Sequence, residues 1–253
     1  MSAVTAMVVD VYGDAIRDQA LARLRAGMST NQVSRELGVS RAAIASWRQR
    51  TYQGQPPCPA PATPSPDYAA LFGFYLGDGC ISRMSRTFAM RVACDARLPG
   101  IIDDVAARFR AVHPDRPVFF VPAAGVITVQ NSWKHWPCLF PQHGPGRKHE
   151  RELGMADWQW AVVQQHPADF LRGLFHSDGC RVNNWATRMV AGHRKRYDYP
   201  RWQFTNHSAE IMSWCCDALD LVDVPWRRSS WKTVSVSTRA GVARLDELIG
   251  PKA

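Results

Sequence analysis

The chain carries one nonapeptide pattern twice, and this internal repeat limits its architecture more than any other feature. Residues 71–79 read LFGFYLGDG and residues 171–179 read LRGLFHSDG, at an offset of 100 residues. A cysteine and a short polar stretch with strand character follow each copy. A repeat of this length is too large for one unit of a solenoid, so we expect two similar half-domains rather than an array.

Similar predicted elements follow the pattern in each half. The first half, 68–152, has predicted strands at 80–84, 87–94, 118–121 and 126–131 and a helix at 98–112. The second half, 153–253, has predicted strands at 180–186, 201–206, 224–229 and 233–238 and helices at 208–221 and 240–249. A Gly-Pro pair followed by a lysine closes each half, at Lys148 and Lys252. We therefore expect an α+β fold of two pseudo-symmetric αββαββα half-domains.

Small residues stand four apart in both copies of the pattern, at Gly73 and Gly77 and at Gly173 and Ser177. Residues four apart share one face of a helix, and small side chains let two helices approach closely. We expect these four residues to form the contact between the two motif helices.

An aspartate ends each copy of the pattern, Asp78 in the first and Asp178 in the second. Two carboxylates at adjacent helix C-termini repel each other and the partial negative charge of the helix ends. A hard divalent cation between them removes this penalty, which predicts a composite Mg²⁺ site held by both aspartates. The alternative is that both aspartates only cap their helices.

The paired motifs resemble the LAGLIDADG (dodecapeptide, DOD-type) homing endonucleases in their single-chain, two-repeat form. The resemblance covers about 68–253. It implies a pseudo-twofold saddle whose two sheets lie along the major groove of double-stranded DNA, and a monomer that acts as a pseudo-dimer. It also implies that the backbone carbonyls of Gly77 and Ser177 add metal ligands. By their position, Lys148 and Lys252 would supply positive charge to the phosphate during two-metal hydrolysis.

The N-terminal residues 1–52 are separated from this body by a proline-rich linker, 53–67, that neither a helix nor a sheet can cross. Predicted helices at 14–26, 30–37 and 41–50 make residues 1–52 a small all-α domain. Residues 29–48 resemble a helix-turn-helix whose third helix presents Arg41, Ser46 and Arg48 to DNA. An ordinary helical hairpin is the alternative.

The balance of charge favours a polyanionic partner, because 31 Lys and Arg residues face 22 Asp and Glu residues, a net charge of +9. Basic residues gather near the second motif, with only Asp198 opposing them between 180 and 201, and again near the last strands. A DNA-facing sheet and loop have this composition, although a solvated loop is an alternative. The candidates for DNA binding are Arg181, Arg194, Lys195, Arg196, Arg201, Arg227, Arg228 and Lys232.

Three functions fit these observations. The first is a metal-dependent endonuclease that hydrolyses phosphodiester bonds at a long double-stranded DNA site. The second is a non-cleaving, sequence-specific transcriptional regulator that reuses the endonuclease fold, and the third is a DNA-associated scaffold. Both aspartates and both trailing lysines favour the first, whereas the N-terminal helices favour the second. No apolar run reaches the roughly 20 residues of a membrane span and no secretory signal pattern is present, so we expect a cytoplasmic protein with no membrane association.

Overall fold

The computed structural model describes residues 14–52 and 65–252. They fall into two compact units, within Met1–Cys58 and within Pro59–Ala253, and each is described by itself. Most of the predicted linker lies outside the described residues. None of the helices in the described ranges is long and apolar enough to cross a membrane.

The N-terminal unit contains three helices, α1 (Asp14–Arg25), α2 (Thr30–Leu37) and α3 (Arg41–Tyr52), within two residues of their predicted bounds. Ser29 and Gln32 form a capping box that starts α2. Gly38, with a φ of 64°, provides the left-handed turn between α2 and α3. The core of this unit is formed by Ala20, Leu21, Val33, Val39, Ala43, Ile44 and Trp47.

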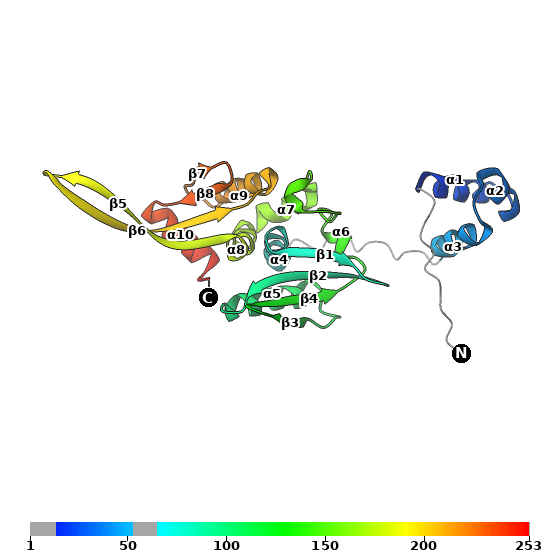
Figure 1. Ribbon diagram of the computed structural model, residues 1–253, viewed down its shortest axis with the longest axis horizontal. Coiled ribbons are helices and arrows are strands. Elements are labelled where there is room, and N and C mark those ends of the chain that lie inside the picture. The colour runs from blue at the N-terminus through cyan, green and yellow to red at the C-terminus, as the bar shows by residue number, and fades with distance from the viewer. Residues whose placement is uncertain (1–13, 53–64, 253) are drawn as a thin grey trace. The chain divides into compact units, whose positions relative to one another are not determined.

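The larger unit consists of two halves with the same topology (Figure 1). The first half contains α4 (Pro66–Leu76), β1 (Gly79–Arg83), β2 (Phe88–Asp95), α5 (Pro99–Val112), β3 (Phe119–Ala123), β4 (Val126–Ser132) and α6 (Trp136–Leu139). The second contains α8 (Pro167–Ser177), β5 (Gly179–Val190), β6 (His193–Thr205), α9 (Ala209–Leu221), β7 (Arg227–Ser230), β8 (Thr233–Val236) and α10 (Arg239–Ile249). Each half forms an antiparallel four-stranded sheet, in the orders β1-β2-β4-β3 and β5-β6-β8-β7. The predicted α+β fold with two αββαββα half-domains is confirmed.

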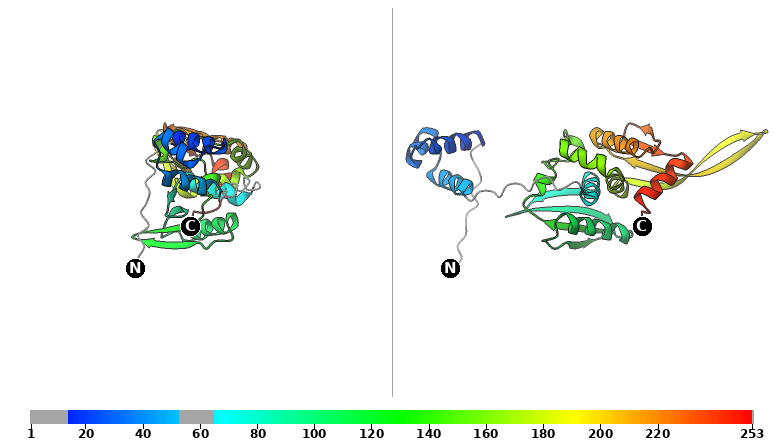
Figure 2. Two further views of the ribbon diagram at one scale, coloured as in Figure 1. Left: turned by 90° about the vertical axis from the view of Figure 1, so that its right-hand side faces the viewer. Right: turned by 180° about the vertical axis from the view of Figure 1, so that it is seen from behind.

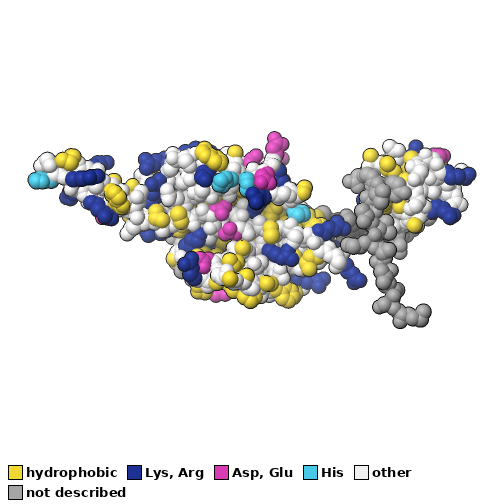
Figure 3. All heavy atoms as spheres, in the orientation of Figure 1, with side chains coloured by type: hydrophobic (Ala, Val, Ile, Leu, Met, Phe, Trp, Pro, Cys, Tyr) yellow, Lys and Arg dark blue, Asp and Glu magenta, His cyan; other side chains and the backbone are white. Residues whose placement is uncertain are grey.

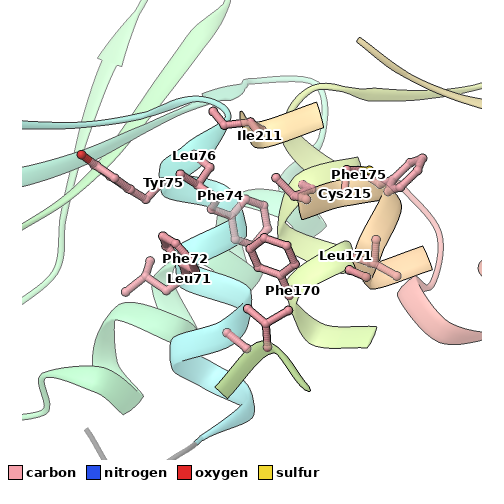
Figure 4. Close-up of a cluster of buried hydrophobic side chains, with 14 of the residues drawn as sticks. Leu71, Phe72, Phe74, Tyr75, Leu76, Phe170, Leu171, Phe175, Ile211 and Cys215 are labelled. Atoms are coloured by element: carbon pink, nitrogen blue, oxygen red, sulfur yellow. The ribbon is translucent and has the colours of Figure 1, made fainter. Parts of the chain in front are cut away.

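The two motif helices, α4 and α8, lie next to each other between the sheets (Figures 1 and 2). Every residue of α4 from Tyr68 to Leu76 is buried, which is possible because the helix is apolar on all sides. Side chains of α4, α8 and α9 interlock in one cluster (Figure 4). The two halves therefore share a single hydrophobic core.

Glycines set the distance between α4 and α8. A Cβ atom placed on Gly73 would lie 2.8 Å from the backbone nitrogen of Leu174 and 2.9 Å from the Cα atom of Gly173. A Cβ atom on Gly173 would lie 2.7 Å from the backbone nitrogen of Phe74. The structure thus places the predicted small residues where the helix backbones approach most closely.

The β5–β6 hairpin and two helices differ from the prediction. Strands β5 and β6 pair over twelve residue pairs, whereas the sequence predicted only 180–186 and 201–206, with a loop between. Polar residues on both faces of this hairpin hide the alternation that marks a half-buried strand. Its turn, Ala191-Gly192, has positive φ at both positions, as two-residue hairpins require. Helix α7 (Asp157–Gln165), which joins the halves, and the short helix α6 were not predicted.

Candidate active site

The two aspartates lie at the adjacent C-terminal ends of α4 and α8. Helix α4 ends at Leu76, with Gly77 as its C-cap, and α8 ends at Ser177, so Asp78 and Asp178 lie just beyond the two helix ends. The two ends are in direct contact, because a Cβ atom on Gly77 would collide with the side chain of Ser177 and lie 3.3 Å from Oδ2 of Asp178. Ser177 itself donates its hydroxyl proton to the carbonyl of Gly173 at 2.8 Å. The fold therefore brings the two predicted carboxylates to one place.

A lysine closes the end of each motif helix. Lys148 donates from Nζ to the carbonyls of Gly77 and Gly79, both at 2.9 Å, and to that of Tyr75. Lys252 donates to the carbonyls of Ser177 at 3.0 Å, Gly179 at 2.7 Å and Phe175 at 3.5 Å. The two sets of acceptors are equivalent in the two halves. A cation at a helix C-terminus is stabilising, since it satisfies carbonyls that lack partners in the helix.

Each aspartate faces the lysine of the other half. Asp178 and Lys148 line one cavity of about 470 Å³, together with Gly77 and Asn206. Asp78 and Lys252 line a second cavity of about 240 Å³, together with Ser177. The centre is thus two crosswise pairs around the contact of the helices, rather than one pair per half.

The charged groups of the centre are destabilised by their surroundings. Burial, and then the nearby Asp178 carboxylate, raise the pKa of Asp78 to about 6 against the opposing effect of Lys252 and Lys148. Burial also raises the pKa of Asp178. Asp78 nevertheless keeps more than a third of its surface exposed, so water screens part of this effect. Desolvation lowers the pKa of Lys148 to about 8 and also lowers the pKa of Lys252.

The donor atoms of the centre suit a hard divalent cation. They are carboxylate and backbone carbonyl oxygens, and Mg²⁺ is commonly held by one or two carboxylates together with water and substrate phosphates. A carbonyl oxygen has two lone pairs, so those of Gly77 and Ser177 keep one after accepting from a lysine. No group of three or more His, Cys, Asp or Glu side chains suited to a metal occurs within 14–52 and 65–252. The residues fit Mg²⁺ and give no all-protein cage for zinc.

Two polar residues of the site were not identified from the sequence. Asn206 donates from Nδ2 to Oδ2 of Asp178 at 2.7 Å. Arg91 occupies the centre of the first sheet and donates to Gln130 at 2.9 Å and to Ser82. Arg91 alternates with buried Met90 and Val92, so its outward direction was readable in the sequence.

The predicted DNA-binding residues of β5 and β6 divide between two faces. Register pairs Arg181 with the buried Trp202, so Arg181 points to the helix side, where it forms an ion pair with Asp246 at 2.8 Å. Arg194 and Arg196 share this face by alternation. Lys195 and Arg201 lie on the opposite face, away from the helices. Period-2 alternation therefore divides the five predicted DNA-binding residues between the two faces of the hairpin.

The other predicted DNA-binding residues lie apart from these. Arg227 pairs in register with Ser235 and shares the face of Arg201, whose Nη2 donates to Ser235 at 2.6 Å. Arg228 lies instead near the thiol of Cys216 on the helix side, and Lys232 follows β7 in the turn to β8. In the N-terminal unit, Arg41 is exposed and Ser46 is half-buried at the start and middle of α3, and the side chain of Arg48 lies outside the described part.

Comparison with solved structures finds LAGLIDADG proteins at low sequence identity. The N-terminal LAGLIDADG domain of DUF199/WhiA is 11% identical, with a TM-score of 0.44 over 76% of this chain and 86% of its own. I-DmoI in complex with DNA and Ca is 10% identical, with a TM-score of 0.46 over 74% and 90%. The LAGLIDADG meganuclease I-AabMI bound to uncleaved DNA is 12% identical, with a TM-score of 0.42 over 73% and 82%. No family model and no curated protein matches the sequence. With TM-scores below 0.5, these similarities do not indicate a function for this chain.

Proposed function

We propose that this chain is a LAGLIDADG-type, metal-dependent endonuclease that hydrolyses phosphodiester bonds in double-stranded DNA. The observation that carries the proposal is the crosswise pairing of Asp78 with Lys252 and of Asp178 with Lys148 at the touching ends of α4 and α8. Two partly desolvated carboxylates side by side are costly for a protein that only needs to end two helices. Binding of a cation between the carboxylates, together with a phosphate, would offset this cost.

The residues divide the work as follows. Asp78 and Asp178, with the carbonyls of Gly77 and Ser177, would hold Mg²⁺, and the bound ion would supply activation of a water and stabilisation of the leaving oxygen of the phosphate. Lys148 and Lys252 orient the helix ends through their carbonyl contacts and place positive charge beside each aspartate. With a pKa of about 8, Lys148 keeps its proton at neutral pH and can balance charge that develops on a phosphate.

The surface for DNA would be the face of each sheet that points away from the helices. It carries Arg91 in the first half and Arg201, Lys195 and Arg227 in the second. The β5–β6 ribbon projects from the sheet and presents Lys and Arg side chains along its length (Figure 3). A two-stranded ribbon fits the major groove of B-DNA. The monomer would supply both halves of a pseudo-dimeric interface.

The second candidate is a transcriptional regulator that binds DNA without cutting it. The observation that favours it is the N-terminal unit, whose capped α2, left-handed Gly38 turn and α3 have the order of a helix-turn-helix. Arg41, Ser46 and Arg48 of α3 would then contact DNA. For either function we propose a cytoplasmic location without membrane association.

The deciding experiment incubates the purified full chain with a plasmid library of randomised inserts and Mg²⁺, with EDTA as the control, and sequences new ends. A recovered target is then tested with Asp78→Asn and Asp178→Asn. Each change removes an anionic ligand and keeps the side-chain shape, so double-strand cleavage should be lost while binding in EDTA persists. Asp103→Asn, an exposed aspartate on α5, is the matched control and should cut normally. Tight binding without cleavage under any divalent cation would instead establish the regulator.

A further inference from the structure

The two halves of the centre are not equivalent, although the backbone around them is. The backbone nitrogen of Ala93 donates to the carbonyl of Asp78 at 3.3 Å, and that of Thr205 donates to the carbonyl of Asp178 at 3.4 Å. These two bonds align β2 with β6 residue by residue. The next residue along the chain is Cys94 in the first half and Asn206, just after the end of β6, in the second.

Asn206 fixes the carboxylate of Asp178. Its Nδ2 donates to Oδ2 of Asp178 at 2.7 Å, and the asparagine is itself held by two further bonds. Its backbone nitrogen donates to the carbonyl of Lys232 at 3.0 Å, and its Oδ1 accepts from the backbone nitrogen of Ser208 at 2.8 Å. With both ends anchored, the amide leaves Asp178 little rotational freedom.

Cys94 gives Asp78 no such support. Its thiol is buried and lies 4.0 Å from the carbonyl of Val92. Among the described residues, none donates a hydrogen bond to the carboxylate of Asp78, which stays exposed to solvent. The carboxylate of Asp78 is therefore the looser of the two.

The two cavities differ in the same direction. The cavity at Asp178 is lined by the basic residues Arg147, Lys148 and Arg151 and by three histidines, His143, His149 and His207. The cavity at Asp78 is about half that volume and contains Lys252 together with a second carboxylate, that of Asp95. A phosphate group is attracted more strongly to the first cavity than to the second. Glu150 offsets part of the difference through its contacts with Arg147 and His149.

We propose that the half-site of Asp178 cuts its DNA strand first and faster, with Asn206 as the positioning residue, so that the reaction passes through a nicked duplex of defined polarity. The inference rests on the proposed nuclease function. A pseudo-twofold protein on duplex DNA presents one half-site to each strand, as symmetric proteins do on palindromic sites. Two unequal half-sites therefore cut the two strands at unequal rates.

The experiment uses the full chain and a duplex recovered from the randomised library, with a different dye on each strand. Cleavage in Mg²⁺ is followed on denaturing gels, and Asp178→Asn and Asp78→Asn assign each strand to its half-site. We expect the strand of Asp178 to be cut about tenfold faster in the wild type, which corresponds to about 1.4 kcal/mol. Asn206→Cys should remove this advantage and leave the other strand unchanged, whereas Cys94→Asn should accelerate the slow strand.

A second readout requires no cleavage. In EDTA, the side-chain amide resonance of Asn206, identified by its loss in Asn206→Cys, should shift when Asp178→Asn is introduced and stay in place with Asp78→Asn. Should Cys94→Asn fail to fold, Asn206→Cys and this spectrum still decide. Equal strand rates in a wild type that cuts, or equal slowing of both strands by Asn206→Cys, overturn the inference alone. A wild type that cuts neither strand overturns the nuclease proposal as well.

Discussion

Replacing Gly173 by alanine perturbs the contact on which the whole centre depends. The added Cβ atom would lie 2.7 Å from the backbone nitrogen of Phe74 and 2.8 Å from the Cα atom of Gly73, and still closer to the carbonyl of Ala70. Ordinary contacts between carbon atoms lie at about 3.5–4.0 Å. All three neighbours are backbone atoms, so no side chain can rotate away. Helices α4 and α8 must therefore move apart by most of an ångström.

The cost follows from what packs across this contact. Overpacking a well-packed core costs about 1–3 kcal/mol, and a gap of about 0.5–1 Å forfeits a quarter to a half of the dispersion energy of the atoms that face it. The upper end applies here, because Phe72 and Phe170, whose ring centroids are 5.5 Å apart, separate together with the backbones. Alanine regains roughly 0.5–1 kcal/mol of helix propensity. We expect Gly173→Ala to lower the free energy of unfolding by about 2 kcal/mol.

The same change should also slow cleavage in protein that remains folded. Asp178 follows Gly173 at the end of the same helix, so separation of α4 and α8 also moves Asp178 away from Asp78. A misplacement of about 1 Å in a catalytic group can cost about 100-fold in rate. Gly173→Ala protein that is fully folded at the assay temperature should thus cut the target at least about tenfold more slowly.

The assay pairs urea unfolding of the larger unit with cleavage of the selected target. Gly154→Ala is the matched control, since a Cβ atom there meets nothing within 4 Å and the backbone has no positive φ. The control should change neither the unfolding midpoint nor the rate. If Gly173→Ala unfolds like the control, the close contact of α4 and α8 is wrong. If it is destabilised but cuts at the wild-type rate, the carboxylates do not depend on that contact.

Three further changes give separate tests. Folding raises the pKa of Asp78 to about 6, so its ionised form opposes folding, and the contribution of Asp78 to metal-free stability should fall as pH rises from about 4 to 6. Asp78→Asn should remove the part of the pH dependence that is due to Asp78 and, after discounting for exposure, stabilise by about 1 kcal/mol at pH 7.5. An unchanged pH profile of the unfolding midpoint would contradict this. Lys148→Ala should slow single-turnover cleavage less than Asp178→Asn does, because the lysine only assists the reaction whereas the aspartate holds the cation. Equal losses of rate would mean that Lys148 is as important for cleavage as a metal ligand. Replacing residues 185–198 by a two-residue Asn-Gly turn should reduce the salt slope of DNA binding by about 0.9 for each phosphate that the ribbon neutralises, and a slope equal to that of the wild type would remove the ribbon from the DNA surface.

Much of the fold could be predicted because the decisive pattern is local and repeated. Gly73 and Gly173 recur at the same place in each motif, and their lack of a Cβ atom has one evident use in an apolar helix, a close helix pair. Once the helices touch, the aspartates that follow them have to meet. The lysines could be predicted for the same reason, since each follows a Gly-Pro pair at nearly the same distance from its aspartate.

The other features of the site depend on tertiary contacts, which the spacing of residues in the sequence does not predict. Asn206 reaches Asp178 only because β6 returns along β5, and the length of that hairpin is hidden by polar residues on both faces. Arg181 and Lys195 lie on opposite faces of the hairpin, and this can be known only from the strand register, not from the number of charges in the segment. The crosswise cavities depend on how the two halves cross at the pseudo-twofold axis, a property of the assembled halves and of neither motif alone.

The charges of the centre explain why cation and DNA should bind together under the proposed function. Two carboxylates and two ammonium groups sum to zero, so the metal-free centre is neutral and each charge is partly balanced by its crosswise partner. One divalent cation makes the sum +2, and the lysines that stabilise the metal-free centre then repel the added charge. A phosphodiester that enters the same cavity carries one negative charge and lowers the sum to +1. Each ligand must therefore raise the affinity for the other by the same factor, and Mg²⁺ should bind the free protein weakly and its complex with DNA much more tightly.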